Sequence, residues 1–289
     1  MFPAIVCPFD KLPLTESTDE LVCSNGHRWK VLREIPRMVL EQSNYADPFG
    51  LQWNTFRQTQ LDSHSNTSIS YKRLRRCLGE ECWAMLSAPK RCDILEAGSG
   101  AGRFTDILLG APSAYVTSTD YSSAVEANLD NCPQSDRHRV IQADILFSPF
   151  HAEQFDLVLC LGVIQHTPNT EETIGKLFNE VKPGGWLVFD HYALTLRSFL
   201  NVNRVIRPVF KRLPPETALR IVRVMVRALF PVHRAVRHRR YLHAALNQIS
   251  PITTYFIGLP DLSDSQHYEW SLLDTHDSLT DFYRHRRTK

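Results

Sequence analysis

The chain has 289 residues, 43% of them hydrophobic, and a net charge of only +2 from 33 basic and 31 acidic residues. This composition is too apolar for a disordered protein, and the length suits one large domain or two smaller ones. The start lacks the segments of a secretory signal, and no apolar run reaches the roughly 18 residues of a membrane span. Seven scattered cysteines, an odd number, indicate reduced thiols in a cytoplasmic protein rather than a disulfide framework.

The first 40 residues form a segment of their own, with several prolines and little helical periodicity. Cys7 is followed three residues later by Asp10, and Cys23 is followed four residues later by His27. The segment resembles a zinc-ribbon or treble-clef knuckle, in which four ligands on two turns hold the metal, with Asp10 where such a knuckle has a cysteine. We expect residues 1–40 to be this knuckle, with Cys7, Asp10, Cys23 and His27 as zinc ligands. The alternative is a metal-free knuckle held by hydrophobic packing.

Residues 41–90 are predicted to form a helical lead-in to the next segment. Leu74, Leu78, Cys82 and Met85 recur at spacings of three and four, as one face of an α-helix requires. Before this stripe, Gln60 and Asp62 are polar residues for which two roles stay open: they cover a ligand or contact a substrate, or they cap a helix.

Residues 91–192 alternate between short apolar runs and helical stretches. The runs expected to be strands are CDILEA (92–97), AYVTST (114–119), RVIQA (139–143), FDLVLCLG (155–162) and GWLVFD (185–190). Continuous apolar runs of this length suit parallel strands that are covered on both faces, and the intervening segments are long enough to be crossovers. The predicted fold class is therefore α/β, a doubly wound, mostly parallel Rossmann-like sheet with helices on both faces.

A glycine-rich segment, ILEAGSGAGRFTDIL (94–108), follows the first predicted strand of this core. Glycines at 98, 100 and 102 let the backbone turn tightly and let a ligand approach, and the following helix offers unpaired N–H groups. A dinucleotide-binding fingerprint needs glycine at the sixth position of the motif, where this chain has Arg103. The spacing therefore argues against a dinucleotide site.

This G-x-G-x-G segment, with Glu96 before it, resembles the first motif of the class I S-adenosylmethionine-dependent methyltransferases. Later segments resemble further motifs of the family: TSTDYS, QADIL, FDLVLCLGVIQHTPN and VKPGGWLVFD. Two flanking segments, residues 44–63 and 270–283, look like segments of bacterial methyltransferases of mostly unassigned substrate. The resemblance therefore covers nearly the whole chain, and it implies S-adenosyl-L-methionine as the cofactor.

The resemblance also assigns roles at the carboxyl ends of the predicted strands, where open α/β sheets bind ligands. It implies that Glu96 orients the methionine amino group, that Asp120 accepts the ribose hydroxyls and that Asp144 recognises the adenine edge. The predicted cofactor site consists of Glu96, Gly98, Ser99, Gly100, Asp120, Tyr121, Asp144, Ile145 and Leu161. The alternative for Asp120 and Asp144 is a role as a helix cap or turn residue.

Two histidines, His166 and His191, follow the fourth and fifth predicted strands and are the candidate catalytic bases. A histidine titrates in the range that is useful for accepting a proton from a hydroxyl nucleophile. The alternatives are that His166 packs on the cofactor and that His191 belongs to a hinge into the next segment.

Residues 193–289 are predicted to form a basic helical lid and a C-terminal tail, with a strand candidate at 252–258. Residues 197–243 contain twelve Lys or Arg and one acid, a net charge of +11, so the rest of the chain carries −9. Three interpretations of this segment stay open. It is a solvated basic face over a substrate-binding lid, a surface for an anionic partner (membrane lipid, a lipid-linked or nucleotide-linked glycan, or RNA), or an interdomain or oligomer contact. Similar proteins continue beyond the position of His285, so we expect the closing edge of the sheet to be either missing or supplied by another segment.

The predicted function is a methyltransferase that modifies oxygen or carbon in a small-molecule, glycan or lipid-linked acceptor. LGVIQ after the fourth strand favours this chemistry, because amino-group methylation in the family is typical of an N-P-P-Y-like tetrad at that position. The alternatives are an RNA methyltransferase that uses the knuckle and the basic segment, and a non-catalytic cofactor-binding module. The sequence does not indicate the oligomeric state.

Overall fold

The computed structural model describes residues 1–40, 45–195 and 201–288. Five parallel strands form its core, in the order β7-β6-β5-β8-β9. They are β5 (Cys92–Ala97), β6 (Ala114–Asp120), β7 (His138–Ala143), β8 (Phe155–Cys160) and β9 (Val181–Phe189). All five predicted strands are confirmed, as is the Rossmann-like α/β class, and β9 begins four residues earlier than expected.

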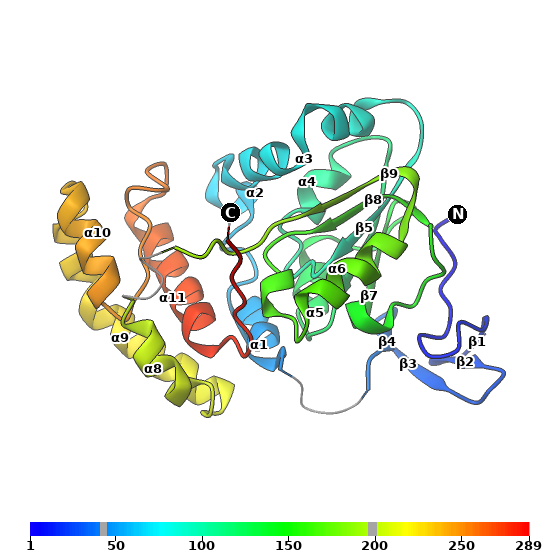
Figure 1. Cartoon of the computed structure of the whole chain (residues 1–289), viewed down its shortest axis with the longest axis horizontal. Helices are drawn as coiled ribbons and strands as arrows, with labels where there is room; N and C mark the ends of the chain where they lie inside the picture. Colours follow the sequence, from blue (N-terminus) through cyan, green and yellow to red (C-terminus); the bar gives the residue numbers. More distant parts are fainter. Residues whose placement is uncertain (41–44, 196–200, 289) are drawn as a thin grey trace.

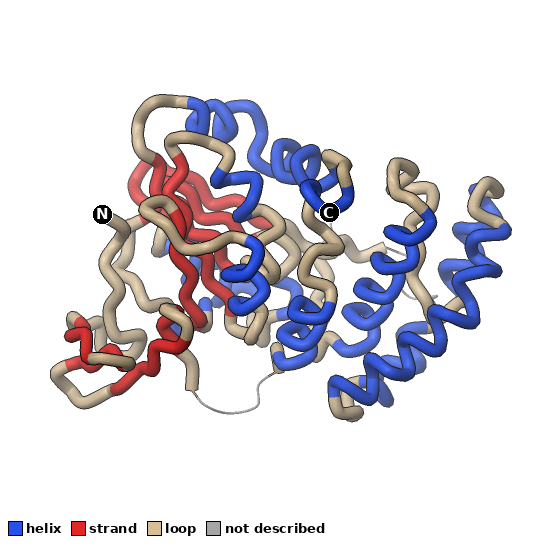
Figure 2. The backbone as a smooth tube through the Cα atoms, turned by 180° about the vertical axis from the view of Figure 1, so that it is seen from behind, coloured by secondary structure: helices blue, strands red, loops and turns tan. Residues whose placement is uncertain are grey.

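Helices cover both faces of this sheet, as Figures 1 and 2 show. They are α3 (Ile69–Ser87), α4 (Thr105–Leu109), α5 (Val125–Asn131) and α6 (Thr170–Asn179). Successive strand residues face opposite sides: Ile94 packs in one hydrophobic cluster with Leu74 of α3, and Leu95 packs in the other with Leu177 of α6. Burial on both faces explains why these strands are continuous apolar runs.

The predicted stripe on α3 is confirmed for Leu74, Leu78 and Cys82, which are all buried. It then continues at Leu86, which is 2% exposed, whereas Met85 is only partly buried. Gly79 has non-helical angles (φ 70°, ψ 175°) that break the helix, so the spacing of one continuous helix does not extend across it.

Four short strands of the N-terminal segment continue the sheet beyond β7. They are β1 (Leu14–Ser17), β2 (Glu20–Cys23), β3 (Arg28–Leu32) and β4 (Ile35–Met38). The first three pairings are antiparallel, and β4 then lies parallel to β7, which gives a nine-stranded sheet. Cys7 and Trp29 share a buried cluster with Ile141 of β7 and Phe155 of β8. The N-terminal segment therefore packs against the hydrophobic core of the sheet.

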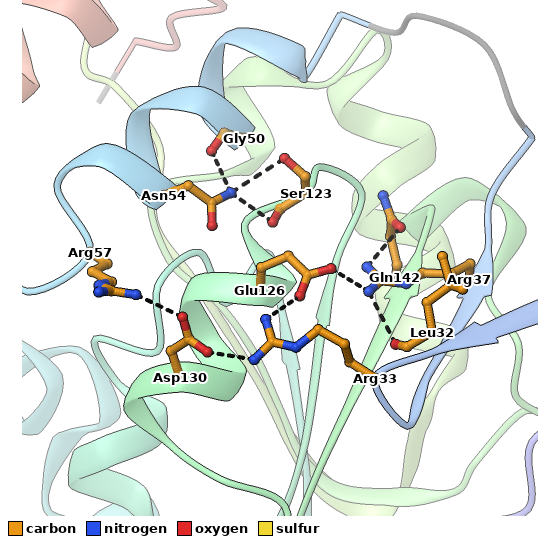
Figure 3. Close-up of polar contacts among 10 residues, drawn as sticks. All are labelled: Leu32, Arg33, Arg37, Gly50, Asn54, Arg57, Ser123, Glu126, Asp130 and Gln142. Atoms are coloured by element: carbon orange, nitrogen blue, oxygen red, sulfur yellow. Dashed lines mark hydrogen bonds and ion pairs between the residues drawn. The ribbon is translucent and has the colours of Figure 1, made fainter.

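Ion pairs attach the same segment to α5, as Figure 3 shows. Arg33 contacts both Glu126 and Asp130 at 2.7 Å, and Arg37 also contacts Glu126. From the other side, Arg57 contacts Asp130 at 2.7 Å. The carboxylates of α5 thus link the N-terminal strands to the lead-in.

A separate helical layer stands at the opposite end of the molecule from the N-terminal strands (Figure 1). It consists of α8 (Asn203–Phe210), α9 (Pro215–Ala235), α10 (Arg240–Ile249) and α11 (Asp264–Thr280). The lead-in helices α1 (Asp47–Thr55) and α2 (Asp62–Ser65) precede α3 in the chain. Within the described residues, no helix is both long and apolar enough to cross a membrane.

The predicted strand at 252–258 is wrong, because this segment has turns and no strand pairing. Ile252 and Phe256 instead pack into the helical cluster with Phe230 of α9, so the apolar residues serve a helix interface. At the outer edge of the sheet, no strand in the described parts of the chain pairs with the free side of β9. A single bridge between Ala193 and Arg287 follows it.

Candidate cofactor and acceptor site

The loop between β5 and α4 has glycine at positions where the backbone is left-handed and the space for a side chain is filled. Gly98 has φ +78°, and a Cβ atom there would lie 2.3 Å from a methyl carbon of Val163. The N–H groups of Gly98 and Ser99 both donate to the carbonyl of Thr119, at 2.7 and 2.9 Å. Gly100 has φ +54°, and its missing side chain leaves room for the Trp53 ring of α1. The loop is therefore fixed from both sides and presents its backbone to the space above it.

Asp120 ends β6 beside this loop. One carboxylate oxygen accepts the N–H of Gly100 at 2.9 Å, and the other accepts the N–H and the hydroxyl of Ser122 at 2.9 and 2.7 Å. Burial raises the pKa of Asp120. The bonds to Ser122 are those of a turn residue, so the local role considered from the sequence is confirmed, and the carboxylate also lines the main cavity.

Asp144 occupies the corresponding position after β7. Its carboxylate accepts the N–H of Leu146 at 2.9 Å and so caps the short 3-10 helix η1 (Ile145–Phe147). Burial raises the pKa of Asp144 as well. The ring of Tyr121 lies 5.4 Å from that of Tyr45, and both tyrosines line the same cavity as Asp144. A carboxylate flanked by aromatic and apolar side chains suits the edge and faces of a flat heterocycle.

A cavity of about 990 Å³ joins these groups to the helical layer. Its volume is at the upper end of the range for small-molecule and cofactor sites. Most of the sequence-predicted site residues line it, namely Gly98, Ser99, Gly100, Asp120, Tyr121, Asp144, Ile145, Leu161 and His166. Its other wall comes from α3, α8, α11 and the segment after α11.

A protein-family model described as "Methyltransferase domain" matches residues 95–189, which include the glycine loop, Asp120, Asp144 and His166. The parallel strand order around β5 and the cavity at the carboxyl ends of the strands agree with that match. Residues 95–189 therefore carry a methyltransferase domain.

Two curated relatives are 27% identical to part of this chain. One is a ubiquinone biosynthesis O-methyltransferase of Hydrogenovibrio crunogenus, aligned over 129 residues, or 43% of this chain and 52% of the relative. The other is a malonyl-[acyl-carrier protein] O-methyltransferase of Priestia megaterium, aligned over 137 residues, or 46% and 50%. The chain thus spans about half the length of these relatives. A solved structure of a putative S-adenosylmethionine-dependent methyltransferase from Methanococcus maripaludis aligns with a TM-score of 0.40 at 16% identity, covering 54% of this chain and 68% of that one.

Glu96 is the predicted cofactor contact that the structure places elsewhere. Its side chain is 3% exposed and accepts a hydrogen bond from the Thr105 hydroxyl at 2.5 Å, and it is absent from the described lining of the cavity. Burial raises the pKa of Glu96 to about 8, so the side chain is mostly protonated at neutral pH. Its described hydrogen bond positions Thr105 at the start of α4, and its contact with a cofactor stays a prediction.

The two histidines have different surroundings. His166 lines the cavity, and its Nδ1 faces the carbonyl of Tyr283 at 3.0 Å and the carboxylate of Asp281 at 3.3 Å. Because both partners are acceptors, Nδ1 donates, and Nε2 is left as the atom that can accept a proton. His191 is absent from the described lining, and its Nε2 is buried with no partner in the part of the chain that the structure describes. The residue after it, Tyr192, lines the cavity, so of the two candidate bases only His166 is among the described lining residues.

Arg103 is a cavity residue that the sequence reasoning missed. Its Nε donates to the Ser70 hydroxyl and its Nη1 to the Gln60 side chain, both at 2.8 Å. It forms no ion pair with the described residues, and burial together with the charge of Arg73 lowers its pKa to about 10. Its position next to the glycine motif was a signal that we used only to exclude a dinucleotide site. A half-buried cation that forms no ion pair with the described residues is suited to an anionic ligand group.

The two lead-in residues with open roles are now distinguished. Asp62 accepts the N–H groups of Ser70 and Tyr71, at 2.9 and 2.8 Å, and thereby caps α3. Gln60 lines the cavity and holds Arg103. The capping alternative is thus confirmed for Asp62, whereas Gln60 belongs to the cavity wall.

Proposed function

We propose that this protein transfers the methyl group of S-adenosylmethionine to a small-molecule acceptor bound between the glycine loop and the helical layer. The observation that carries this proposal is the cavity, which joins the carboxyl ends of β5, β6 and β7 to a separate wall of lid residues. The end of the cavity at the strands suits a nucleoside with an amino-acid tail, and the end at the lid residues leaves room for an acceptor. Because the lid chooses the acceptor while the domain positions the cofactor, the domain match alone does not identify the acceptor.

In this proposal, different cavity residues contact different parts of the cofactor. Gly98, Ser99 and Gly100 lie against its methionine part, Asp120 accepts the ribose hydroxyls, and Asp144 accepts the adenine amino group. Arg103 binds the methionine carboxylate, because it is the half-buried cation next to the loop that forms no ion pair with a described carboxylate. The bound cofactor supplies an electrophilic methyl group.

His166 is the proposed base for the acceptor. Asp281 and the Tyr283 carbonyl orient its ring, and the rings of Phe49 and Tyr192 pack edge-on against it at 5.1 and 5.5 Å. Its Nε2 would take the proton of an acceptor hydroxyl as the oxygen attacks the methyl carbon. The two relatives described above are named as O-methyltransferases, which favours oxygen over carbon as the methylated atom.

The test of this function has two steps. Calorimetry with S-adenosylhomocysteine should show one binding site per chain, and incubation of the protein with methyl-labelled cofactor and a small-molecule extract should give a labelled product. Absence of binding would contradict the proposal at its first step. Binding without transfer to any extract would favour a non-catalytic module, and transfer to an RNA fraction alone would favour the RNA alternative.

We further propose that Cys7, Asp10, Cys23 and His27 bind zinc. Their ligand atoms all lie within 4.8 Å of one another. His27 Nδ1 is 3.4 Å from each of the two sulfurs and 3.2 Å from Asp10 Oδ2, and Cys23 Sγ is 3.6 Å from the same oxygen. A tetrahedral zinc ion with bonds of 2.0–2.3 Å separates its ligand atoms by roughly 3.3–3.8 Å. These four side chains are therefore already at about the spacing that the ion needs.

The zinc prediction is checked by metal analysis. Protein purified without chelator should contain about one zinc per chain, and Cys23→Ser should lose it and melt at a lower temperature, because the site lies on the core shared with β7 and β8. Cys77→Ser is the matched control, since Cys77 is a half-buried thiol outside the cluster. A metal-free wild type whose melting temperature is unchanged by chelator would show that the knuckle stands on hydrophobic packing alone.

For the basic segment we propose contact with an anionic membrane surface rather than RNA. On α9, Arg220, Arg223 and Arg227 are exposed and bond no described residue, and among them lie Ile221 and Val224, with exposures of 38% and 69%. Basic residues interleaved with exposed aliphatic ones on one helix suit a lipid interface, where both the headgroups and the acyl boundary are available. RNA offers phosphates but no partner for the aliphatic side chains.

Vesicle sedimentation checks this contact. The protein should sediment with vesicles that contain phosphatidylserine and not with phosphatidylcholine alone, and Arg220→Gln/Arg223→Gln should reduce the bound fraction severalfold. The control Lys90→Gln/Lys176→Gln removes the same charge from exposed positions elsewhere. Equal sedimentation of both double variants, or salt-sensitive RNA binding without vesicle binding, would contradict the membrane contact.

A further inference from the structure

The cavity face of α3 carries a cationic stripe. Ile69, Lys72, Arg73 and Arg76 all line the cavity, and their spacing of three, four and seven residues places them on one side of the helix. Leu74 and Leu78 lie on another side and pack into the core. The orientation of α3 that buries its apolar stripe thus points three basic side chains toward the acceptor space.

Of Lys72, Arg73 and Arg76, only Arg73 forms an ion pair with a described residue. Arg73 contacts Asp190, the residue after β9, at 2.6 Å. Lys72 and Arg76 form no hydrogen bond or ion pair with the described residues. Asp190 also accepts the N–H of Gly162, which follows β8, at 2.6 Å. The stripe is thereby anchored at the carboxyl ends of β8 and β9, where His166 also lies.

A further cation reaches the cavity from the segment after α11. Arg286 lines the cavity, is half-buried, and has no bonding partner in the parts of the chain that the structure describes. Its neighbour Arg284 is held by the buried Asp281 at 2.5 Å. The main chain of the next residue, Arg287, bonds to Tyr192 just beyond β9. Arg286 is therefore tied to the same edge of the sheet as the stripe on α3.

The carboxylates of the cavity do not balance these cations. Asp120 and Asp144 lie at the cofactor end, and Asp261 is exposed. Burial raises the pKa of Asp274 to about 7, so part of its negative charge is lost at neutral pH, and burial also raises the pKa of Asp277. The acceptor end thus keeps an excess of positive charge, and a cleft with low-dielectric walls focuses such a field.

Resting on the proposed methyl transfer, we propose that the acceptor carries an anionic group, a phosphate or a carboxylate, that Lys72, Arg76 and Arg286 bind. Guanidinium and ammonium groups form charge-assisted hydrogen bonds with such oxygens, and they hold the group at the mouth of the cavity. The rest of the acceptor then extends toward the end of β8, with its nucleophile near His166. The cations choose and orient the acceptor, and they take no part in cofactor binding.

The experiment uses the full chain saturated with S-adenosylhomocysteine and titrates it with inorganic phosphate and, separately, with succinate. Lys72→Gln/Arg76→Gln should weaken binding of the preferred anion at least about tenfold, the loss expected when charge-assisted hydrogen bonds are removed. Arg286→Gln should weaken it in the same direction. Lys90→Gln/Lys176→Gln removes equal charge from exposed positions outside the cavity and should leave anion binding unchanged. Tighter binding of inorganic phosphate would indicate a phosphate group on the acceptor, and tighter binding of succinate would indicate a carboxylate.

The outcomes separate this inference from the proposed function. If the wild type binds S-adenosylhomocysteine but neither anion, or if the two double variants bind the anion equally well, the anionic acceptor is wrong and the methyltransferase proposal stands. If neither the wild type nor any variant binds S-adenosylhomocysteine, the proposed function itself fails. All variants should keep wild-type affinity for S-adenosylhomocysteine, so loss of that affinity in Lys72→Gln/Arg76→Gln would instead place these residues at the cofactor.

Discussion

Asp120→Ala is expected to lower the affinity of the protein for S-adenosylhomocysteine at least about 100-fold, because in the proposed binding mode two hydrogen bonds from ribose hydroxyls to a charged acceptor are lost together. The substitution also removes the acceptor for the Gly100 N–H, so the glycine loop loses one of the bonds that shape it. Both effects act on binding, and isothermal titration calorimetry measures them.

The matched control for this variant is Asp136→Ala, which removes an exposed aspartate outside the cavity. It should leave the affinity unchanged, and thermal melting of both ligand-free variants should show that Asp120→Ala remains folded. Retention of wild-type affinity by a folded Asp120→Ala protein would remove Asp120 from the cofactor site. It would also contradict the assignment that rests on its family motif.

Asp281→Ala is expected to lower the free energy of unfolding by about 3–5 kcal/mol, the usual cost of removing one partner from a buried ion pair. Asp281 is fully buried and contacts Arg207 of α8 at 2.7 Å, Arg284 at 2.5 Å and His166 at 3.3 Å. It therefore joins the helical layer and the C-terminal segment to the loop after β8. Its removal leaves two guanidinium groups without their counterion, and urea denaturation measures the loss.

The pH dependence of stability tests the same network. Burial alone would raise the pKa of Asp281, but the hydrogen bond with His166 and the charges of Arg284 and Arg207 outweigh it and lower the pKa below the ordinary 3.8. A depressed pKa contributes stability above the ordinary value, and this contribution is lost as the pH falls through the folded-state pKa. The stability difference between wild type and Asp281→Ala should accordingly narrow below about pH 4.

The control for this network is Asp264→Ala at the start of α11. Asp264 also contacts two arginines, Arg234 and Arg237, but its side chain is 42% exposed. Exposed ion pairs contribute about 1 kcal/mol or less, so this variant should be nearly as stable as the wild type. Equal losses of unfolding free energy in Asp264→Ala and Asp281→Ala would show that burial does not strengthen the ion pairs of Asp281.

The predictions that succeeded depended on local signals. The five core strands were recognisable because each is an apolar run covered on both faces, and Gly98 and Gly100 were recognisable because their backbone angles exclude other residues. The sequence grouped Cys7, Asp10, Cys23 and His27 because each of the two pairs is three or four residues apart, and the fold brings the pairs together. Zinc binding by this cluster stays a prediction. The segment 252–258 misled because an apolar run has the same composition whether it pairs in a sheet or packs among helices.

The amino-acid sequence by itself determined the parallel core, the glycine loop and the acidic residues at the ends of β6 and β7, since strand periodicity and backbone angles are properties of a few neighbouring residues. Only the tertiary structure decided which charges share the cavity and which are neutralised. His166 and Asp281 lie 115 residues apart in the chain, and Arg73 and Asp190 lie 117 apart. The net charge of +11 in residues 197–243 likewise did not reveal that Asp281 and Asp264 pair with three of its arginines. Electrostatic interaction depends on distance and burial in space, and neither follows from distance along the chain.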